Sequence, residues 1–588
     1  MRLRRGRHDD SGNERIDQVG WRRARSAGSA VGVMSSGASE DGVARLIVRC
    51  LENEGVSHVF GIPGEENIRL VDALSASSIR YVLVRHEQAA SFMAEVYGRL
   101  TGNAGVCSAT LGPGAINLLL GVADATTNST PVVALSAQVG MDRKFKESHQ
   151  GVDLVSIFAP ATKWSELIAT PGAVPEMVRK AFKLAQTERP GAVYLAVPED
   201  VEKARAPDGA RPLVVNTPRP DEPSASQLQR AADVLRAARN PIVLAGHGAA
   251  RAGASDAVRR FAETLGVAVA TTFHGKGVLP DDHAQALGAV GFMSHDYVNF
   301  GFDRADAIVA VGYELQEFDP ARINPNCDKK IIHVHRFPAE VDVHYEVEVG
   351  LQSDIGRTLD ALAAEVGRRF VPDVGKQRIR AMIDGELERG RRDSRFPMAP
   401  ARIVADTRSA LGRDDIVLVD TGALKMWMAR LYPTYEPNTC LISNGLSTMA
   451  WTLPGAIAAK IARPDARVLV ATGDGAFMMN SQEIETALRE RVPIVVLIWV
   501  DDEYGLIKWK MELELGHSIA TAFGNPDFVA YAESFGADGY RIEAPEELLP
   551  TLRQALTEDT VSVISCPVDY SANLELIAAL GELDESLS

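Results

Sequence analysis

Two carboxylates stand at positions where the chain could hold a cation. Asp474 lies in a Gly-Asp-Gly turn that ends a β-branched run at 468–471, and Asp501 follows the apolar run at 494–500. If the fold brings these carboxylates together, they repel unless a cation lies between them, and an all-oxygen site suits Mg²⁺ or Ca²⁺. A hard cation with few protein ligands usually holds phosphate as well. The backbone N–H groups after Gly475, at a helix start, would bind that anion.

The segment from 468 to 500 predicts the elements that position these carboxylates. Its apolar run, Gly-rich turn, helical stretch and second apolar run indicate one strand-helix-strand unit. Asn480 followed by Glu483 is typical of a capping box that opens the helix. The two strands of such a unit are parallel, with a right-handed crossover. Asp474 and Asp501 are therefore expected at the carboxyl edge of one sheet, where open α/β sheets bind ligands.

Each motif alone has a simpler interpretation, because Gly-Asp-Gly turns are common and the acids after Trp499 could form a solvated turn. The joint pattern, with the second acidic loop 27 residues after Asp474, resembles the thiamine diphosphate signature of the decarboxylase and carboligase superfamily. The resemblance implies a Mg²⁺ site made by side-chain oxygens of Asp474 and Asp501 and by the backbone carbonyl of Glu503. Many members have Asn at the second of these positions.

The N-terminal third carries three further motifs. They are a turn with Pro63 and Gly64, a helix at 85–102 with Glu87 in its first turn, and a Gly-Pro-Gly turn followed by Asn117. An isolated Glu at a helix start would merely complement the helix dipole. In this order and at these spacings, however, the motifs resemble the pyrimidine-binding domain of the same superfamily. The resemblance implies that Glu87 contacts the pyrimidine ring of the cofactor and activates it.

Longer motifs narrow the resemblance, which covers about 40–575, to acetolactate synthases, and among these to the catabolic, FAD-independent type. They are KESHQGVDLVSIFAPATKW (146–164), IIHVHRFPAEVD (331–342), ISNGLSTM (442–449) and YAESFGA (531–537). The resemblance implies decarboxylation of pyruvate and transfer of the hydroxyethyl group to a second pyruvate, giving 2-acetolactate and CO₂. The cofactor would accept the electron pair that decarboxylation leaves behind.

The same resemblance assigns further residues to the site. Gln138, His149 and Gln150 would orient the substrate beside the catalytic Glu87. Met449 would support the bent shape of the cofactor, and an ordinary core Met is the alternative. The residues expected to bind the cofactor are Pro63, Gly64, Glu87, Thr110, Pro113, Asn117, Lys425, Ser447, Met449, Gly473, Asp474, Gly475, Ala476, Tyr504 and Gly505.

Two departures from family patterns bear on the cofactors. Lys425 replaces the His or Gln usual near the diphosphate, and it would either add charge there or point to solvent. At 314–320 the chain has ELQEFDP, where flavin-binding acetohydroxyacid synthases have a loop with two arginines, so FAD is not expected. The Gly-rich stretch at 246–253 is interpreted as a strand-to-helix turn rather than a nucleotide loop.

Alternating strands and helices predict an α/β protein, with three doubly wound parallel-sheet domains of the thiamine diphosphate-dependent type. The 588 residues are long enough for this organisation. Residues 1–38 hold eight Arg against four acids, and Met34 is an alternative start of the protein. The predicted parts are a disordered basic tail (1–38), the N-terminal pyrimidine-binding domain (39–205), a linker (206–226), a central α/β domain without FAD (227–373), a connector (374–395) and the C-terminal diphosphate- and Mg²⁺-binding domain (396–588).

Composition excludes several classes of partner. The net charge of −16 and the pI near 5.3 argue against binding to nucleic acid or to an anionic membrane surface. No apolar run approaches the ~20 residues of a transmembrane helix. Five cysteines are scattered without a Cys-x-x-Cys spacing, which indicates a reducing cytoplasm.

The resemblance also implies a partner, because in relatives the cofactor bridges domains from two subunits. We therefore expect a homodimer or homotetramer with sites at the subunit interface, acting on pyruvate in acetoin or branched-chain amino acid synthesis. The alternatives are an FAD-containing anabolic acetohydroxyacid synthase subunit, another thiamine diphosphate-dependent 2-keto acid decarboxylase or carboligase, and a non-catalytic homologue. The joint presence of Glu87, Asp474 and Asp501 argues against the last.

Overall fold

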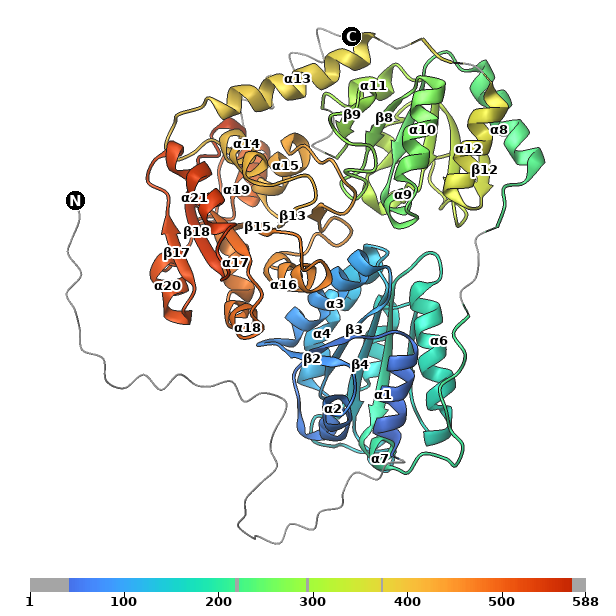
Figure 1. The fold of residues 1–588 in the computed structure, drawn as a ribbon, viewed down its shortest axis with the longest axis vertical. Helices are drawn as coiled ribbons and strands as arrows, with labels where there is room; N and C mark the ends of the chain where they lie inside the picture. The colour runs from blue at the N-terminus through green and yellow to red at the C-terminus, as the bar shows by residue number, and fades with distance from the viewer. Residues whose placement is uncertain (1–41, 217–220, 292–295, 368, 372–373, 574–588) are drawn as a thin grey trace, which may run out of the picture.

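The computed structural model describes residues 42–216, 221–291, 296–367, 369–371 and 374–573. The predicted tail, 1–38, lies outside this part. The described chain forms three lobes, each built on one six-stranded sheet (Figure 1). All paired strands in these sheets are parallel. The predicted fold class, α/β with three parallel sheets, is confirmed.

The N-terminal sheet has the strand order β2-β1-β3-β4-β6-β5. Its central strand β4 is buried along its whole length, as expected for a parallel sheet that helices cover on both faces. Helix α3 ends at Gly102, whose positive φ of 73° is the usual left-handed helix stop. The elements are α1 (Val43–Asn53), β1 (His58–Gly61), α2 (Ile68–Ser75), β2 (Arg80–Leu83), α3 (Glu87–Thr101), β3 (Gly105–Ala109), α4 (Pro113–Thr127), β4 (Val132–Gln138), α5 (Leu154–Phe158), β5 (Trp164–Leu167), α6 (Val174–Gln186), β6 (Ala192–Pro198) and α7 (Glu199–Lys203).

The central sheet has the order β12-β11-β10-β7-β8-β9. Helix α13 (Val374–Arg391) then runs across to the third lobe (Figure 1). The elements of the central lobe are α8 (Ala225–Ala237), β7 (Pro241–Ala245), α9 (His247–Arg251), α10 (Ser255–Leu265), β8 (Ala268–Thr271), β9 (Ala286–Ala289), α11 (Asn299–Asp303), β10 (Ala307–Val311), β11 (Lys330–His335), β12 (Val347–Gln352) and α12 (Ile355–Val366).

The C-terminal sheet has the order β14-β13-β15-β16-β18-β17, which repeats the topology of the N-terminal sheet strand for strand. The amino-acid sequence shows no internal repeat from which this shared topology could be predicted. The elements are α14 (Pro400–Ala410), β13 (Ile416–Val419), α15 (Ala423–Leu431), β14 (Cys440–Ile442), α16 (Thr452–Ala462), β15 (Val468–Gly473), α17 (Asp474–Asn480), α18 (Glu483–Arg489), β16 (Val495–Val500), α19 (Gly505–Leu515), α20 (Phe528–Phe535), β17 (Asp538–Arg541), α21 (Leu548–Ala555) and β18 (Ser562–Pro567).

The C-terminal sheet shares a hydrophobic core with each of the other lobes. Along β13, Ile416 and Leu418 pack in a cluster with N-terminal residues such as Phe92. Val417 and Val419 pack on the other side, in a cluster with central residues such as Ile308. This alternation follows from the two-residue period of a strand. One face of the C-terminal sheet therefore belongs to a core shared with the N-terminal lobe, and the other face to a core shared with the central lobe.

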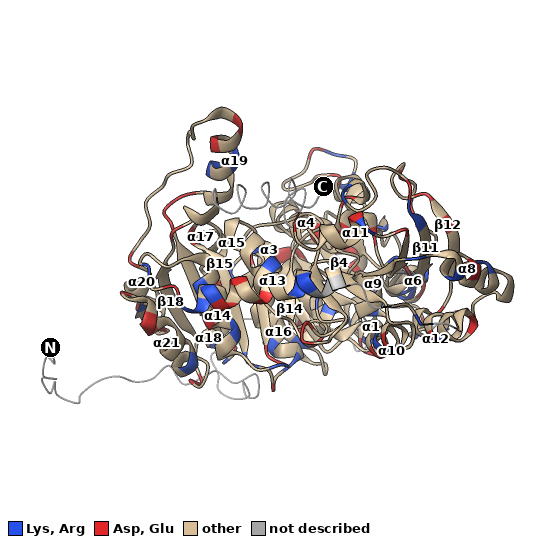
Figure 2. Cartoon of the chain, turned by 90° about the horizontal axis from the view of Figure 1, so that it is seen from above, with Lys and Arg blue, Asp and Glu red and all other residues tan. Residues whose placement is uncertain are grey.

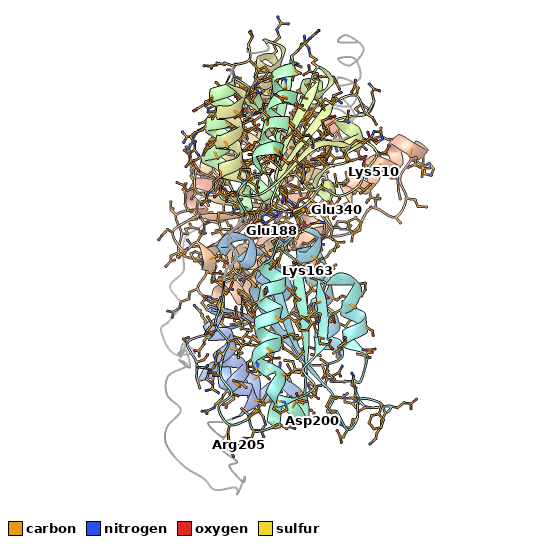
Figure 3. All side chains as sticks on the ribbon, turned by 90° about the vertical axis from the view of Figure 1, so that its right-hand side faces the viewer. Lys163, Glu188, Asp200, Arg205, Glu340 and Lys510 are labelled. Atoms are coloured by element: carbon orange, nitrogen blue, oxygen red, sulfur yellow. The ribbon has the colours of Figure 1, made fainter. Side chains whose placement is uncertain are left out.

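Ion pairs join the N-terminal and central lobes directly. The Arg251 guanidinium donates to Glu188 at 2.9 Å and to Glu314 at 2.8 Å. Glu188 lies where these two lobes meet (Figure 3), and Glu314 is almost fully buried. No helix within the described ranges is long and apolar enough to cross a membrane.

The predicted strand-helix-strand unit at 468–500 is confirmed in outline, because β15 and β16 are adjacent and parallel. The predicted capping box is wrong. Asn480 ends α17 and its amide donates to the carbonyl of Ala450 at 2.9 Å, while Glu483 begins a separate helix, α18. Its carboxylate bonds to another lobe instead, a contact between distant segments that local spacing could not reveal.

Candidate active site

Asp474 stands where β15 passes into α17, at the carboxyl edge of the C-terminal sheet. Its Oδ2 accepts from the backbone N–H groups of Asp501 at 3.1 Å and Asp502 at 2.8 Å. Its Oδ1 accepts from the N–H of Gly475 at 2.8 Å. The register pairs Gly473 with Trp499, so the two acidic loops meet as predicted.

The Asp501 side chain is half-buried in this loop pair. Burial, together with the nearby negative charges of Asp474 and Glu503, raises the pKa of Asp501 to about 7. The pKa of Asp474 is also raised, chiefly by burial. The shift of Asp474 expresses the cost of burying a carboxylate, and that of Asp501 expresses this cost together with repulsion by the neighbouring acids. A divalent cation with oxygen ligands would remove that cost.

Asn525 is a residue that the sequence reasoning missed. Its Nδ2 donates to Asp474 Oδ2 at 2.8 Å and to Asp502 Oδ1 at 2.7 Å. It therefore holds the Asp502 side chain in an outer position, where φ is +56°. Asn525 follows Asp474 by 51 residues, and no motif or spacing marked it.

The remaining acid of this loop, Glu503, turns its side chain to Lys508, with Oε2 2.5 Å from the ammonium. This leaves only its backbone for a metal, in line with the predicted ligand set. Within the described part of the chain, no three His, Cys, Asp or Glu side chains cluster as a metal site. Two carboxylates and a backbone carbonyl suit a hard cation that takes its other ligands from phosphate or water.

A pocket opens beside these acids, and its described lining comes entirely from the C-terminal lobe. It includes the predicted residues Met449, Gly473, Asp474, Gly475, Ala476, Asp501, Glu503, Tyr504 and Gly505. It also includes residues that the sequence reasoning did not name: Thr421, Gly422, Ala423, Leu424, Leu506, Ile507 and Tyr570.

Helix starts surround this pocket. α15 begins at Ala423 and α19 at Gly505, and residues of both first turns line it. The first N–H groups of a helix have no intrahelical acceptor and carry partial positive charge, so they bind anions. The pocket thus offers donors for a diphosphate and acceptors for a cation. Its residues fit thiamine diphosphate with Mg²⁺.

A second group of predicted residues gathers at the carboxyl edge of the N-terminal sheet. Glu87 begins α3, and its Oε2 accepts from the Asn117 amide at 3.0 Å. A Cβ on Gly114 would lie 3.1 Å from Glu87 Oε1, and one on Gly64 would lie 2.3 Å from the Cβ of Thr110. Both glycines are therefore needed for close packing. Pro63 precedes Gly64 in its turn, and Pro113 begins α4.

The predicted substrate-orienting residues lie near this second group. Gln138 ends β4 and is buried, with its Nε2 donating to the carbonyl of Val152 at 3.0 Å. Gln150 packs against Gly112 of the Gly-Pro-Gly turn, since a Cβ built on Gly112 would lie 3.0 Å from the Cβ of Gln150. His149 is exposed in the same loop. None of the N-terminal candidates lines the described pocket.

Lys425 neither lines the pocket nor points to solvent. Its Nζ donates to the carbonyl of Ser443 at 3.0 Å and to Ser447 Oγ at 3.1 Å. Burial lowers the pKa of Lys425 to about 8. Lys425 and Ser447 together hold the segment that leads to Met449, and Ala450, on the other side of that Met, has a left-handed φ of 68°.

Comparisons with known proteins agree with this geometry. Three domain families match, described as the N-terminal thiamine pyrophosphate binding domain (residues 42–157), the central domain (228–362) and the C-terminal thiamine pyrophosphate binding domain (420–566) of thiamine pyrophosphate enzymes. The chain therefore belongs to the thiamine pyrophosphate enzymes, and its enzymatic class is that of a thiamine diphosphate-dependent transferase.

Within this class the chain belongs to the acetolactate synthase family. It is 35% identical over 551 residues to an acetolactate synthase of Bacillus subtilis, covering 91% of this chain and 94% of that protein. It is also 35% identical over 545 residues to a catabolic acetolactate synthase of Raoultella terrigena, covering 91% and 97%. A probable acetolactate synthase large subunit of Methanocaldococcus jannaschii is 33% identical over 563 residues, covering 92% and 94%.

Proposed function

We propose that the protein is an acetolactate synthase, which joins two pyruvates into 2-acetolactate and releases one CO₂ with uptake of one proton. The observation that carries this proposal is the Asp474 and Asp501 pair beside helix starts, in a chain similar to acetolactate synthases over 91% of its length. Thiamine diphosphate, when bound, supplies a ring that accepts the electron pair left by decarboxylation.

The residues of the chain then have distinct tasks. Asp474, Asp501 and the backbone carbonyl of Glu503 hold Mg²⁺, and the first turns of α15 and α19 bind the diphosphate. Glu87 would face the pyrimidine ring of the cofactor and could pass a proton at its carboxyl group. Its bond from the Asn117 amide orients that carboxyl. His149 and Gln150 would bind pyruvate, and Gln138, whose buried amide bonds to the carbonyl of Val152, would hold the loop that carries them.

The active form in this proposal is at least a homodimer with sites shared between subunits. The pocket is lined by the C-terminal lobe, while Glu87 lies in the N-terminal lobe, so a second copy would bring the two groups together. α19 stands clear of the body of the molecule (Figure 2), and Figure 3 shows Lys510 out on it. Its Ile507, Leu513 and Leu515 are exposed, and a second copy of the chain would cover them.

FAD is not required in this proposal. The turn at Gly246, which could otherwise take a phosphate, already has an internal acceptor. Glu317 accepts from the N–H of His247 at 2.9 Å and of Glu314 at 3.0 Å, and from Thr272 Oγ1 at 2.5 Å. Addition of FAD should leave the thermal unfolding temperature and the activity unchanged. A yellow protein with bound flavin as purified would contradict this.

The test is product analysis. Purified protein with pyruvate, thiamine diphosphate and Mg²⁺ should give one acetolactate and one CO₂ for two pyruvates. Acetaldehyde as the sole product would identify a keto-acid decarboxylase instead. Because one relative is named a large subunit, the same assay with 2-ketobutyrate as competing acceptor distinguishes a biosynthetic from a catabolic preference.

A further inference from the structure

Glu483 is a buried carboxylate that bonds across two lobes. It begins α18 in the C-terminal lobe, and its side chain is fully buried. Its Oε1 accepts from the backbone N–H groups of Arg85 and His86, each at 3.1 Å. Its Oε2 accepts from Thr486 Oγ1 at 2.6 Å. Both backbone donors lie in the N-terminal lobe, directly before Glu87.

The two backbone donors sit at a critical turn. Arg85 and His86 connect β2 to α3, and His86 is the residue that caps α3, with its Nδ1 accepting from the N–H of Gln88 at 3.1 Å. Backbone N–H groups buried at such a junction need an acceptor. Because Glu483 supplies it, the position of α18 determines how the chain enters α3 and where Glu87 begins.

A carboxylate is a costly choice for this position. Burial raises the pKa of Glu483 to about 7, so part of the free energy of its hydrogen bonds is spent on desolvation. Oε1 accepts from both backbone N–H groups, and Oε2 accepts from Thr486 Oγ1 and also lies 3.3 Å from the Arg85 N. An amide has only one accepting oxygen, so its NH₂ group would face the Arg85 N–H at the other position, whereas both oxygens of a carboxylate accept.

Glu483 is also connected along the chain to the pocket that contains Asp474. α17 begins at Asp474 and ends at Asn480, whose amide bonds to Ala450 next to Met449, and α18 begins three residues later. We propose that Glu483 is a positioning residue that fixes the turn in front of Glu87 from the segment that carries Asp474. This inference rests on the proposed function for the role of Glu87. In a dimer with shared sites, Glu483 connects the metal end of one site to the activating glutamate of the other.

A matched control lies at the same lobe junction. Glu490, at the end of α18, forms an ion pair with Arg80 at the start of β2. It joins the same two lobes without contacting the turn at 85–86. Glu490→Gln therefore measures the effect of loosening the junction, and Glu483→Gln measures that effect together with the loss of the turn's acceptor.

The first measurement needs no cofactor. Amide hydrogen exchange of the apo protein, followed by mass spectrometry in peptides that cover 84–90, should accelerate at least tenfold in Glu483→Gln and less than twofold in Glu490→Gln. If Glu483→Gln does not fold, Glu483→Asp is measured instead. It keeps the charge but is one methylene shorter, so its exchange should accelerate less than tenfold but more than that of Glu490→Gln. Unchanged exchange in the Glu483 variant, or equal acceleration in both variants, would overturn the inference.

The second measurement is kinetic. Glu483→Gln should lower kcat at least tenfold, while the Mg²⁺ concentration for half-activation changes less than threefold. A variant that keeps wild-type kcat and loses only Mg²⁺ or cofactor affinity would contradict a role at Glu87. Failure of the proposed function is separable, since a Glu87→Gln variant with wild-type turnover would refute the role of Glu87 and leave the exchange result standing.

Discussion

At the scale of the residue, Asp474 is a carboxylate whose position the surrounding chain fixes through hydrogen bonds. Three donors fix its Oδ2, two of them backbone N–H groups of the loop that carries the second acid. Asp501 is the more weakly held member, and burial beside Asp474 raises its pKa to about 7. Asp474 is thus fixed in position, and the charge of the pair is unfavourable without a cation, which supports the proposed Mg²⁺ site.

Replacement of Asp501 should separate the ligand from its neighbours. Asp501→Ala is expected to raise the Mg²⁺ concentration for half-activation at least about tenfold, which corresponds to a loss of about 1.4 kcal/mol. Asp501→Asn should be milder, because an amide oxygen still coordinates. Asp502→Ala should change little, since Asn525 holds that side chain outward. Mg²⁺ titration of activity at saturating cofactor checks all three, and equal sensitivity at 501 and 502 would refute the assignment.

The activating glutamate has its own test. Glu87→Gln should bind thiamine diphosphate with little change but retain less than about a tenth of kcat, a loss above about 1.4 kcal/mol. The amide cannot exchange the proton that the carboxyl group holds. Calorimetry measures cofactor binding and steady-state kinetics measures kcat. Activity near that of the wild type would mean that another group activates the cofactor.

The acids of the candidate site could be predicted from the sequence, but the residues that hold them in position could not. Asp474 and Asp501 follow apolar runs, and parallel strands bring such positions together, so their proximity was predictable. Asn525 was not, because it comes from a loop 51 residues away with no periodic pattern. Lys425 and Glu483 were misjudged for the same reason, since their partners Ser443 and Arg85 are distant in sequence.

At the scale of the element, the loop after β10 supplies an internal acceptor to the turn that opens α9. Glu317 bonds to the turn that opens α9 and is fully buried beside Glu314. Burial and the charge of Glu314 raise the pKa of Glu317 to about 8, whereas Arg251 and Arg189 hold that of Glu314 down at about 2. The two acids therefore titrate in separate pH ranges.

This separation predicts a pH dependence of stability. Between about pH 5 and 8 the folded protein keeps the proton of Glu317 and the unfolded chain does not, so the stabilising contribution of this group falls as pH rises. Glu317→Gln cannot lose a proton, so its stability relative to the wild type should rise from pH 5.5 to pH 8. This change adds to a loss that is independent of pH, because the amide replaces one of two accepting oxygens. Denaturant unfolding at pH 5.5 and pH 8 measures the difference. A difference independent of pH would show that Glu317 is ionised throughout.

At the scale of the whole molecule, one topology is used twice. The N-terminal and C-terminal sheets have the same strand order, and each carries one group of site residues at its carboxyl edge. The fold class and the three lobes could be predicted from alternating apolar runs and helices. The repeated topology and the sharing of cores between lobes could not, because both depend on contacts between distant segments.

Shared sites lead to a prediction about mixed oligomers. Glu87→Gln and Asp474→Ala homodimers should each be nearly inactive. After subunit exchange, a mixed dimer has one site with both changes and one site with neither, so about a quarter of the wild-type activity should return in an equal mixture. Activity after mixing, with sedimentation to confirm the dimer, measures this. No recovery in freely exchanging subunits would place each complete site within one chain.

Because the two faces of the C-terminal sheet belong to cores shared with the other two lobes, the order of synthesis on the ribosome affects folding. β6 ends at Pro198, but β18, an inner strand of the last sheet, ends at Pro567. At 5–20 residues per second, roughly 20 to 75 s separate these points in synthesis. Throughout that interval the N-terminal lobe exposes the apolar face that the C-terminal lobe will cover, and the central lobe does so from the time its last helix, α12, has been synthesised. Nascent chains of this enzyme should therefore depend on chaperones, and a stalled chain is expected to aggregate rather than persist as a folded fragment.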